Sequence, residues 1–523
     1  MLTERESAAF LKRQGNAVSN ALLWAGLHEA CYFYAIPNRN KFWQSKEDQG
    51  QQKGTRVYDT TAIEATKTFV SKLHTAMTPP QTQWGYMQVD KNWAKNNPES
   101  LYEAQSILDD YMRNLFDYIH QSNFDVVINE CYFDSAVGTA CLVANSYTDK
   151  QPLLFTSIPM DKLAIEEAMT GRIESWYRSW EAVKINEINV RWPKAVVPDH
   201  MLQSSIDDPC ATVAKINEGV MFMPSNPEKP YMYVVMANDE ELYSEAFKVN
   251  PGIVWRFQKT NSDIFGRGPI MDALPSIISL NELARVELAA ANLNTFKPYM
   301  AFSDAVFNPH TFVMQPMSII PIAPLSNQGQ PPLIPLPDSS APQFSQLTIS
   351  DLRMQVKELL FAQSPLQTDS VQPLSATESM IAQQELAAKI GPLFSRLQQE
   401  FLFPLLERCA YILETMGILP KPKIKGAKLS FQYKSPLALA KNQEQIARIS
   451  QYVQIIQGTL GAEEAKLYIN SSKYPWMLAN LMQLDPDFLN TPEDVARVAQ
   501  QMQDQMEAQQ AQAQQQQQQQ PGG

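Results

Sequence analysis

The sequence predicts an α+β protein that is predominantly helical, and three observations lead to this fold class. Apolar residues recur at helical spacing in long segments toward both ends of the chain. Between residues 131 and 192 the pattern changes to short β-rich pieces separated by turn residues. The chain has 523 residues, 44% hydrophobic and 10% aromatic, which are globular values, and its length predicts two to four domains.

Three helices are expected before the β-rich part. Asp59-Thr60-Thr61-Ala62 caps the second of them, which runs to about Met77 and stops at Pro79-Pro80. A third is expected over 99–121. The first covers about 1–45, and its apolar residues at helical spacing are Phe10, Leu11, Ala17, Leu22, Leu23, Leu27, Ala30 and Cys31.

The β-rich part predicts strands at 138–143, 153–158 and 174–180 in a mixed sheet. Residues 231–236 and 253–258 are expected to form a further strand pair. These strands follow helices and precede helices, as in an α+β domain.

Helices return after the strands. Residues 270–296 predict one long helix with Pro269 at its first position, and Pro275 should bend it or shift its start. The next segment, 297–344, carries ten prolines, a density that no helix survives. Its apolar pieces predict short edge strands that find their partners on another chain. A second helix is expected from about 348 to 361.

A very long helix follows the polar loop at 363–374. It begins at Ser375-Ala376-Thr377-Glu378, which matches a capping box, and ends at Gly417. Gly391-Pro392 and Pro404 each remove a backbone hydrogen bond, so a kinked helix is predicted. Beyond it we expect a strand at 428–433, helices from 435 to about 457 and from Thr491, and a Gln-rich tail. The tail is read as a disordered end, with a binding element as the alternative.

The net charge and the cysteine pattern limit the classes of function that the chain can have. The net charge of −12 and pI of about 5.1 argue against a protein that grips nucleic acid by neutralising phosphates. If DNA is a partner, the chain should let it slide. Five scattered cysteines without a secretory signal indicate reduced thiols in a cytoplasmic compartment, and no apolar run reaches membrane-spanning length.

No enzyme motif is complete, so no catalytic, metal or cofactor residue is predicted. His28-Glu29 begins like a zinc-protease motif, but Tyr32 stands where the second histidine belongs. Gly266-Arg267-Gly268 lacks the third glycine of a dinucleotide loop and is interpreted as a tight turn before a helix. The chain has no G-x-x-x-x-G-K-[ST] or G-x-S-x-G sequence, and its five histidines do not cluster.

Over roughly residues 5–460, a set of local sequences in this order resembles the portal (head-to-tail connector) proteins of short-tailed bacteriophages. The stretches are Tyr58-Asp59-Thr60-Thr61-Ala62, Leu73-His74-Thr75-Ala76-Met77-Thr78-Pro79-Pro80, Phe265-Gly266-Arg267-Gly268-Pro269-Ile270-Met271-Asp272-Ala273-Leu274-Pro275, Ser375-Ala376-Thr377-Glu378, Gly391-Pro392-Leu393-Phe394-Ser395-Arg396-Leu397-Gln398 and Ser435-Pro436-Leu437-Ala438. The Gln-rich C-terminus departs from the family pattern.

The resemblance implies a late structural protein of the virion that forms a ring, usually a dodecamer, at one capsid vertex. The ring is a DNA translocation channel for packaging and ejection of the double-stranded viral genome. Implied partners are further copies of the chain, the terminase large subunit, major capsid and scaffolding proteins, tail adaptor and nozzle proteins, and internal core proteins. Assembly would take place in the host cytoplasm. Twelve copies would sum to about −144, a conduit that avoids tight phosphate contacts.

By this resemblance the chain divides into a wing, stem, clip, tunnel loop, channel helix and crown. The expected bounds are wing 1–268, first stem helix 269–296, Pro-rich clip 297–345, second stem helix 346–362, tunnel loop 363–374, kinked channel helix and remaining wing 375–460, helical crown 461–505 and disordered tail 506–523. An intradomain loop is the alternative for the clip, and an ordinary surface connection is the alternative for the tunnel loop.

The resemblance also suggests which side chains meet DNA. Those of the tunnel loop and channel are Gln363, Ser364, Gln367, Thr368, Gln372 and Lys389; those of the stem are Lys297, Arg353 and Lys357; and the helix kink falls at Gly391 and Pro392. A soluble subunit of a non-viral ring-shaped pore or secretion assembly is the alternative function. An unrecognised hydrolase is the third hypothesis.

Overall fold

The computed structural model describes residues 3–39, 56–97, 100–208, 210–295, 299–301, 333–335, 342–362, 395–433 and 436–460, with single residues at 474, 478 and 497. The chain forms two compact units, one of residues 1–96 and 108–433, the other of 97–107 and 434–523. Helices and strands are mixed in the first unit, as the α+β prediction requires. In the described part of the chain, no helix combines the length and the hydropathy of a membrane span.

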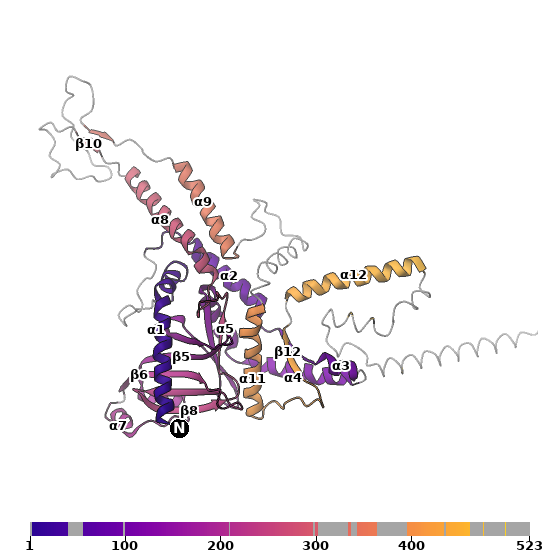
Figure 1. Ribbon diagram of the computed structural model, residues 1–523. Helices are drawn as coiled ribbons and strands as arrows, with labels where there is room; N and C mark the ends of the chain where they lie inside the picture. The colour runs from indigo at the N-terminus through magenta and orange to yellow at the C-terminus, as the bar shows by residue number, and fades with distance from the viewer. Residues whose placement is uncertain are drawn as a thin grey trace, which may run out of the picture. The chain divides into compact units, whose positions relative to one another are not determined.

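A five-stranded antiparallel sheet lies in the first unit, in the order β4-β5-β6-β7-β8. The N-terminal helix α1 (Glu4–Ala35) lies across it (Figure 1), with Phe10 against Tyr177. The helix expected at the N-terminus is present, but the exposed fractions of Leu22 and Leu23 are 53% and 83%, so these two apolar residues do not lie in the core. Ala21 and Trp24 pack there instead. The strands are β4 (Leu163–Glu167), β5 (Ile173–Lys184), β6 (Thr212–Phe222), β7 (Tyr231–Ala237) and β8 (Glu240–Phe247).

A three-stranded sheet has the order β3-β2-β9, with β2 (Thr139–Ser146) between β3 (Leu153–Ile158) and β9 (Gly252–Arg256). The predicted pairing of 231–236 with 253–258 was therefore wrong. The short turn at Asn238 and Asp239, both with positive φ, closes β7 onto β8, which leaves β9 to pair with β2. Helices α6 (Ile185–Arg191) and α7 (Asp199–Asp207) and the 3-10 turn η2 (Met160–Lys162) lie in the connections.

The predicted second and third helices are present as α2 (Thr61–Met77) and α4 (Leu101–Gln121). The Thr61 amide donates to the Asp59 carboxylate at 2.9 Å, which satisfies one free donor of the α2 start. The sequence did not predict α3 (Lys91–Asn96), α5 (Phe124–Val137) or β1 (Gly85–Val89). The predicted strand β12 (Leu429–Tyr433) pairs with β1 in an antiparallel arrangement.

Two helices, α8 (Pro269–Thr295) and α9 (Pro342–Leu359), pack side by side (Figure 1). Pro269 occupies the first position of α8 as predicted, and Pro275 lies inside the helix without shifting its start. Between these helices, β10 (Tyr299–Ala301) and β11 (Leu333–Pro335) pair with each other. The expectation that such strands find their partners on another chain was wrong for these two.

The predicted long helix is described from Ser395 onward. After a short α-helical stretch it contains a π turn (Gln398–Leu402) and continues as α11 (Phe403–Thr415). The irregularity expected at Pro404 is thus present as a π turn immediately before it. The predicted end is confirmed, since Gly417 has φ +72° and the Ile418 amide bonds back to Leu413.

The second unit contains α12 (Pro436–Leu460), which confirms the helix expected from 435 and ends slightly later. The start of the long helix at 375–394, the helix expected from Thr491 and the Gln-rich tail lie outside the described residues.

Candidate functional site

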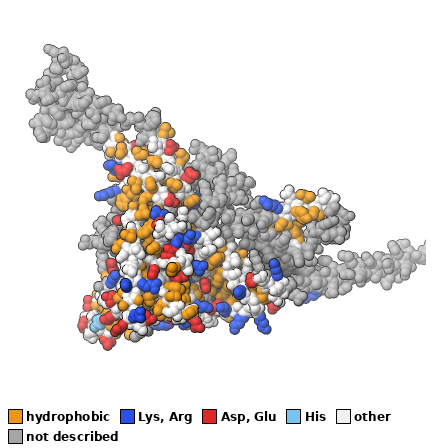
Figure 2. Space-filling model, viewed as in Figure 1, with side chains coloured by type: hydrophobic (Ala, Val, Ile, Leu, Met, Phe, Trp, Pro, Cys, Tyr) orange, Lys and Arg blue, Asp and Glu red, His pale blue; other side chains and the backbone are white. Residues whose placement is uncertain are grey.

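The surface of the α8 and α9 pair carries large apolar side chains that nothing in the described chain covers. On α9, Leu347 is 64% exposed and Met354 is 52% exposed, and they share one helix face because seven residues make about two turns. On α8, Val286 is 54% exposed and Leu288 is 53% exposed. Figure 2 shows these helices with apolar side chains gathered over them.

The buried face of α9 explains why the two helices stay together. Ile349, Val356 and Leu360 are each at most 4% exposed, and they recur at helical spacing on the opposite side from Met354. The helix therefore has one apolar face inside this chain and a second one outside it.

An ion pair fixes α9 to the start of α2. Arg353 Nε and Nη2 donate to Asp59 Oδ2 at 2.9 and 2.8 Å. The Asp59 side chain is only 3% exposed, whereas that of Arg353 is 51% exposed. Burial alone would raise the pKa of Asp59, but hydrogen bonds from Thr61 and Arg353 outweigh it and lower that pKa.

The predicted stem cations are thus only partly placed. Arg353 is bound by Asp59 within the chain, and Lys357 is half-buried one turn later. Outside the described residues lie Lys297, Gln363, Ser364, Gln367, Thr368, Gln372, Lys389, Gly391 and Pro392.

The chain leaves α9 toward the predicted tunnel loop through an anchored turn. Phe361 has φ +53°, and the Ala362 amide donates back to the Lys357 carbonyl at 2.8 Å. Lys72 of α2 donates to the Phe361 carbonyl at 3.1 Å. The Phe361 ring lies 6.0 Å from the ring of Phe69, so both backbone and side chain are held by α2.

The chain returns at Ser395 and is anchored again within two turns. Glu400 accepts from the Arg256 amide at 3.0 Å, from Arg256 Nε at 3.3 Å and from Arg256 Nη2 at 2.8 Å. Arg396 Nη1 adds a fourth bond at 3.0 Å. The carboxylate therefore has donors from both its own helix and β9.

Arg256 connects this helix to the larger sheet. Its side chain is fully buried, and its Nη1 donates to Glu167 Oε1 at 3.1 Å and its Nη2 to the Gly171 carbonyl at 2.7 Å. Glu167 is also paired with Lys259. Burial alone would lower the pKa of Arg256, but Glu400 and Glu167 raise it, so the guanidinium stays charged.

The glycines of the Gly266-Arg267-Gly268 stretch serve close backbone packing. A Cβ on Gly268 would lie 2.2 Å from the Ala136 carbonyl oxygen, and one on Gly266 would lie 2.5 Å from that of Gly138. The Gly266 amide donates to Thr139 Oγ1 at 2.8 Å. These contacts support the tight-turn interpretation over a phosphate-binding loop.

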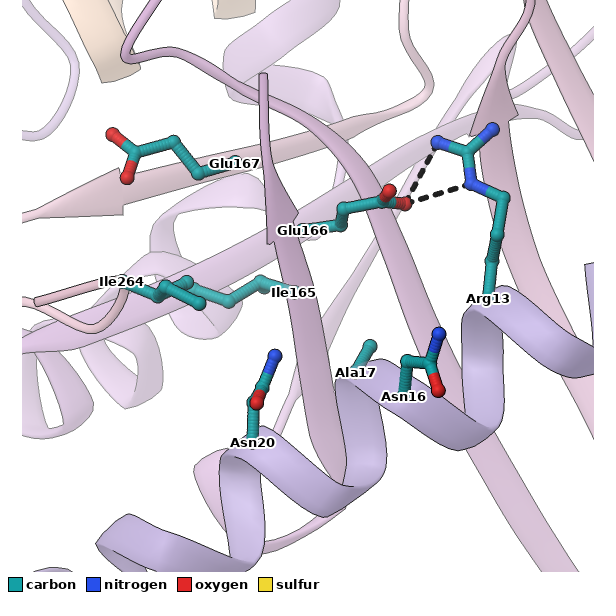
Figure 3. A pocket seen from close by; sticks show the side chains of 8 residues that line it. All are labelled: Arg13, Asn16, Ala17, Asn20, Ile165, Glu166, Glu167 and Ile264. Carbon is teal, nitrogen blue, oxygen red and sulfur yellow. Dashed lines mark hydrogen bonds and ion pairs between the residues drawn. The ribbon is translucent and has the colours of Figure 1, made fainter. Parts of the chain in front are cut away.

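A polar recess of about 360 Å³ lies between α1, β4 and Ile264 (Figure 3). Arg13 reaches across it and pairs with Glu166, while Glu167 points away from that pair toward Arg256. The remaining lining residues are Asn16, Ala17, Asn20 and Ile165. Nowhere in the described residues do three His, Cys, Asp or Glu side chains gather as a metal site requires.

The sequence reasoning missed Asp59, Arg256 and Glu400 as anchoring residues. For Arg256 a signal existed, because an arginine inside the apolar run Ile253-Val254-Trp255 must find partners if the strand is buried. Asp59 was noted only as a helix cap.

Comparison with known proteins gives one family and one curated relative. A family model described as "Bacteriophage head to tail connecting protein" matches residues 16–489. A protein of Bordetella phage BPP-1 named "Probable portal protein" is 21% identical over 546 residues, which cover 97% of this chain and 93% of that protein.

Two solved structures also align with the chain. A chain in the structure "Virion of native gene transfer agent (GTA) particle" has a TM-score of 0.35 and 12% identity, covering 82% of this chain and 91% of that one. A chain in "Neck of empty GTA particle computed with C6 symmetry" has a TM-score of 0.33 and 12% identity, covering 75% of this chain and 86% of that one.

Proposed function

The chain belongs to the bacteriophage head to tail connecting protein family and is a phage portal protein, and from that premise we propose that its copies close into a ring at one capsid vertex. Double-stranded DNA would pass through this ring during packaging and ejection. The family membership argues against the alternative function, a subunit of a non-viral pore or secretion ring.

The exposed apolar face of α9 carries the ring proposal. Leu347 and Met354 lie on a helix whose other face is already packed, and no described part of this chain covers them, so a neighbouring copy is the partner that we assign to them. Head-to-tail contacts that close by rotation would place this face against a different face of the next copy. Val286 and Leu288 of α8 are two residues apart, so they point to nearly opposite sides of the helix and would not both enter the same contact.

The charge of the chain supports passage of DNA over tight binding. A net charge of −12 per copy disfavours a phosphate-gripping surface, and sparse cations would suffice to guide the duplex. Lys297, Lys357 and Lys389 remain candidates for such cations. Arg353 is a weaker one, because Asp59 already neutralises it.

During packaging the chain would have a structural role, and the terminase large subunit would hydrolyse ATP. We assign 297–345 to docking the terminase and then the tail adaptor and nozzle, and 363–374 to the tunnel loop. Capsid, scaffolding and internal core proteins would contact the ring elsewhere. It would assemble in the host cytoplasm and stay at the portal vertex of the virion.

Negative-stain microscopy of the purified full-length protein tests the ring and counts its subunits in end views. Leu347→Asp with Met354→Asp should leave single subunits, because each carboxylate would be buried unpaired in the contact. Ile206→Asp on α7 is the matched control, since Ile206 is 73% exposed but belongs to neither α8 nor α9. Single wild-type subunits at every concentration, or rings from the double variant, would overturn the proposal.

A further inference from the structure

The π turn directs two consecutive side chains at two consecutive residues of β9. Glu400 bonds to Arg256, and the Phe401 ring lies 4.3 Å from the Trp255 ring with an interplanar angle of 30°. Phe401, Trp255 and Arg256 are all fully buried. The helix is therefore attached to β9 by a polar contact at Glu400 and an apolar contact at Phe401. Both contacts depend on how the helix is rotated about its axis.

A π turn changes that rotation because it contains one residue more than an α turn. The Phe403 amide bonds to the Gln398 carbonyl, five residues back. Without the extra residue, the helix before the turn would rotate by about 100° and shift by about 1.5 Å relative to α11, and Glu400, inside the turn, would be moved by part of that rotation. Glu400 would then no longer face Arg256. The helix thus has two possible registers, and only one of them makes the described contacts.

Two features compete as the cause of the π turn. Pro404 has no amide hydrogen and its ring collides with the carbonyl of residue 400 in a continuous helix. A proline, however, needs only some interruption, and a simple kink would satisfy it equally well. The three hydrogen bonds from Arg256 to Glu400 require this particular register.

We propose that Glu400 is a positioning residue that fixes the helix register by binding Arg256, with Pro404 only permitting it. The effect of this register on DNA passage rests on the proposed portal function. Under the proposed function, the register would determine which side chains this helix turns toward the passing DNA. Through Arg256 and Glu167 the same register is tied to β4 of the larger sheet.

Structure determination of the full-length protein and three variants tests the register directly. Pro404→Ala should keep the π turn, because Glu400 still holds it. Pro404→Ala with Glu400→Gln should become a continuous α-helix, since the glutamine amide opposes the Arg256 guanidinium with a donor. Pro404→Ala with Arg408→Lys is the matched control, because it weakens a buried arginine of the same helix without touching Glu400, and it should keep the turn.

Loss of the π turn in Pro404→Ala alone would overturn the proposal, and so would its persistence in the double variant with Glu400→Gln. If that double variant fails to fold, Pro404→Ala still decides between the two causes.

A packaging reaction with procapsids and the cognate terminase tests the consequence. At equal ring yield, the Pro404→Ala, Glu400→Gln variant should fill at least tenfold fewer heads than Pro404→Ala, and the Arg408→Lys control should match Pro404→Ala. Equal packaging by a variant with the shifted register would overturn the functional half. Absence of packaging by the wild-type ring would instead overturn the portal function, while the register would still be decided by the structures.

Discussion

Removal of the Asp59–Arg353 pair should weaken the attachment of α9 to α2 by a predictable amount. Asp59→Asn retains an oxygen for the Thr61 amide but turns an amide NH2 toward Arg353, so it removes the ion pair together with its hydrogen bonds. Because half of the Arg353 side chain is exposed, solvent screens the pair, which contributes about 1 kcal/mol. Asp59→Ala also removes the acceptor at the start of α2, which adds about 1 kcal/mol and gives a loss of about 2 kcal/mol.

Hydrogen exchange of the α2 amides measures this loss of stability locally. A double-mutant cycle with Arg353→Met gives the coupling energy between Asp59 and Arg353. The pKa of Asp59 is lowered on folding, so the native state holds the proton less tightly than the unfolded chain does. The contribution is therefore complete above the unfolded pKa of about 3.9 and is lost as the pH falls through the lower folded pKa. A coupling energy near zero at neutral pH, or a loss of coupling already at about pH 6, would refute this reasoning.

Three further changes should affect stability. Burial lowers the pKa of His28 to about 4. The free energy of unfolding should therefore fall by about 3 kcal/mol as the pH falls from about 6.5 to 4, because the unfolded chain binds the proton more tightly. Denaturant titrations measure this pH dependence, and His28→Phe should flatten it. Gly268→Ala should cost about 3 kcal/mol in the same titrations at neutral pH, because its Cβ would collide with the Ala136 backbone, and a neutral result would contradict the close packing. Arg408→Met should lower the free energy of unfolding by about 2 kcal/mol, since the carbonyls of Ala144 and Val249 would lose the hydrogen bonds that Arg408 donates. An unchanged denaturation midpoint would show that these hydrogen bonds do not stabilise the fold.

Helix positions followed from the sequence because their signals are local. Pro269, the Asp59 cap and the Gly417 end each act within one turn, and the structure has helices α8, α2 and α11 beginning or ending there. Strand pairing is decided by distant parts of the chain, so β9 was predicted as a strand but given the wrong partner. The Asn238-Asp239 turn contained the missing signal, because two residues that tolerate positive φ favour a tight hairpin at that point.

The π turn could not have been predicted from the apolar spacing, which indicates only a helix. Leu397, Phe401 and Leu405 are four residues apart and are each at most 1% exposed. Repeated steps of four drift around an α-helix by about 40° each, so these three residues span about 80° and would fit one apolar face of a regular helix as well. What the spacing could not show is the partner, because Arg256 lies 144 residues away in the chain.

The two anchors around 363–394 differ in strength, and solvent exposure decides the order. On the outgoing side, Asp59 holds an arginine that is 51% exposed, and Lys72 holds one carbonyl. On the returning side, Glu400 holds Arg256, which is fully buried and paired with a second carboxylate. Screening limits the first to about 1 kcal/mol, whereas separating a buried pair leaves an uncompensated charge and costs about 3–5 kcal/mol. By its ion pair alone, α9 is therefore held to α2 less strongly than the returning helix is held to β9.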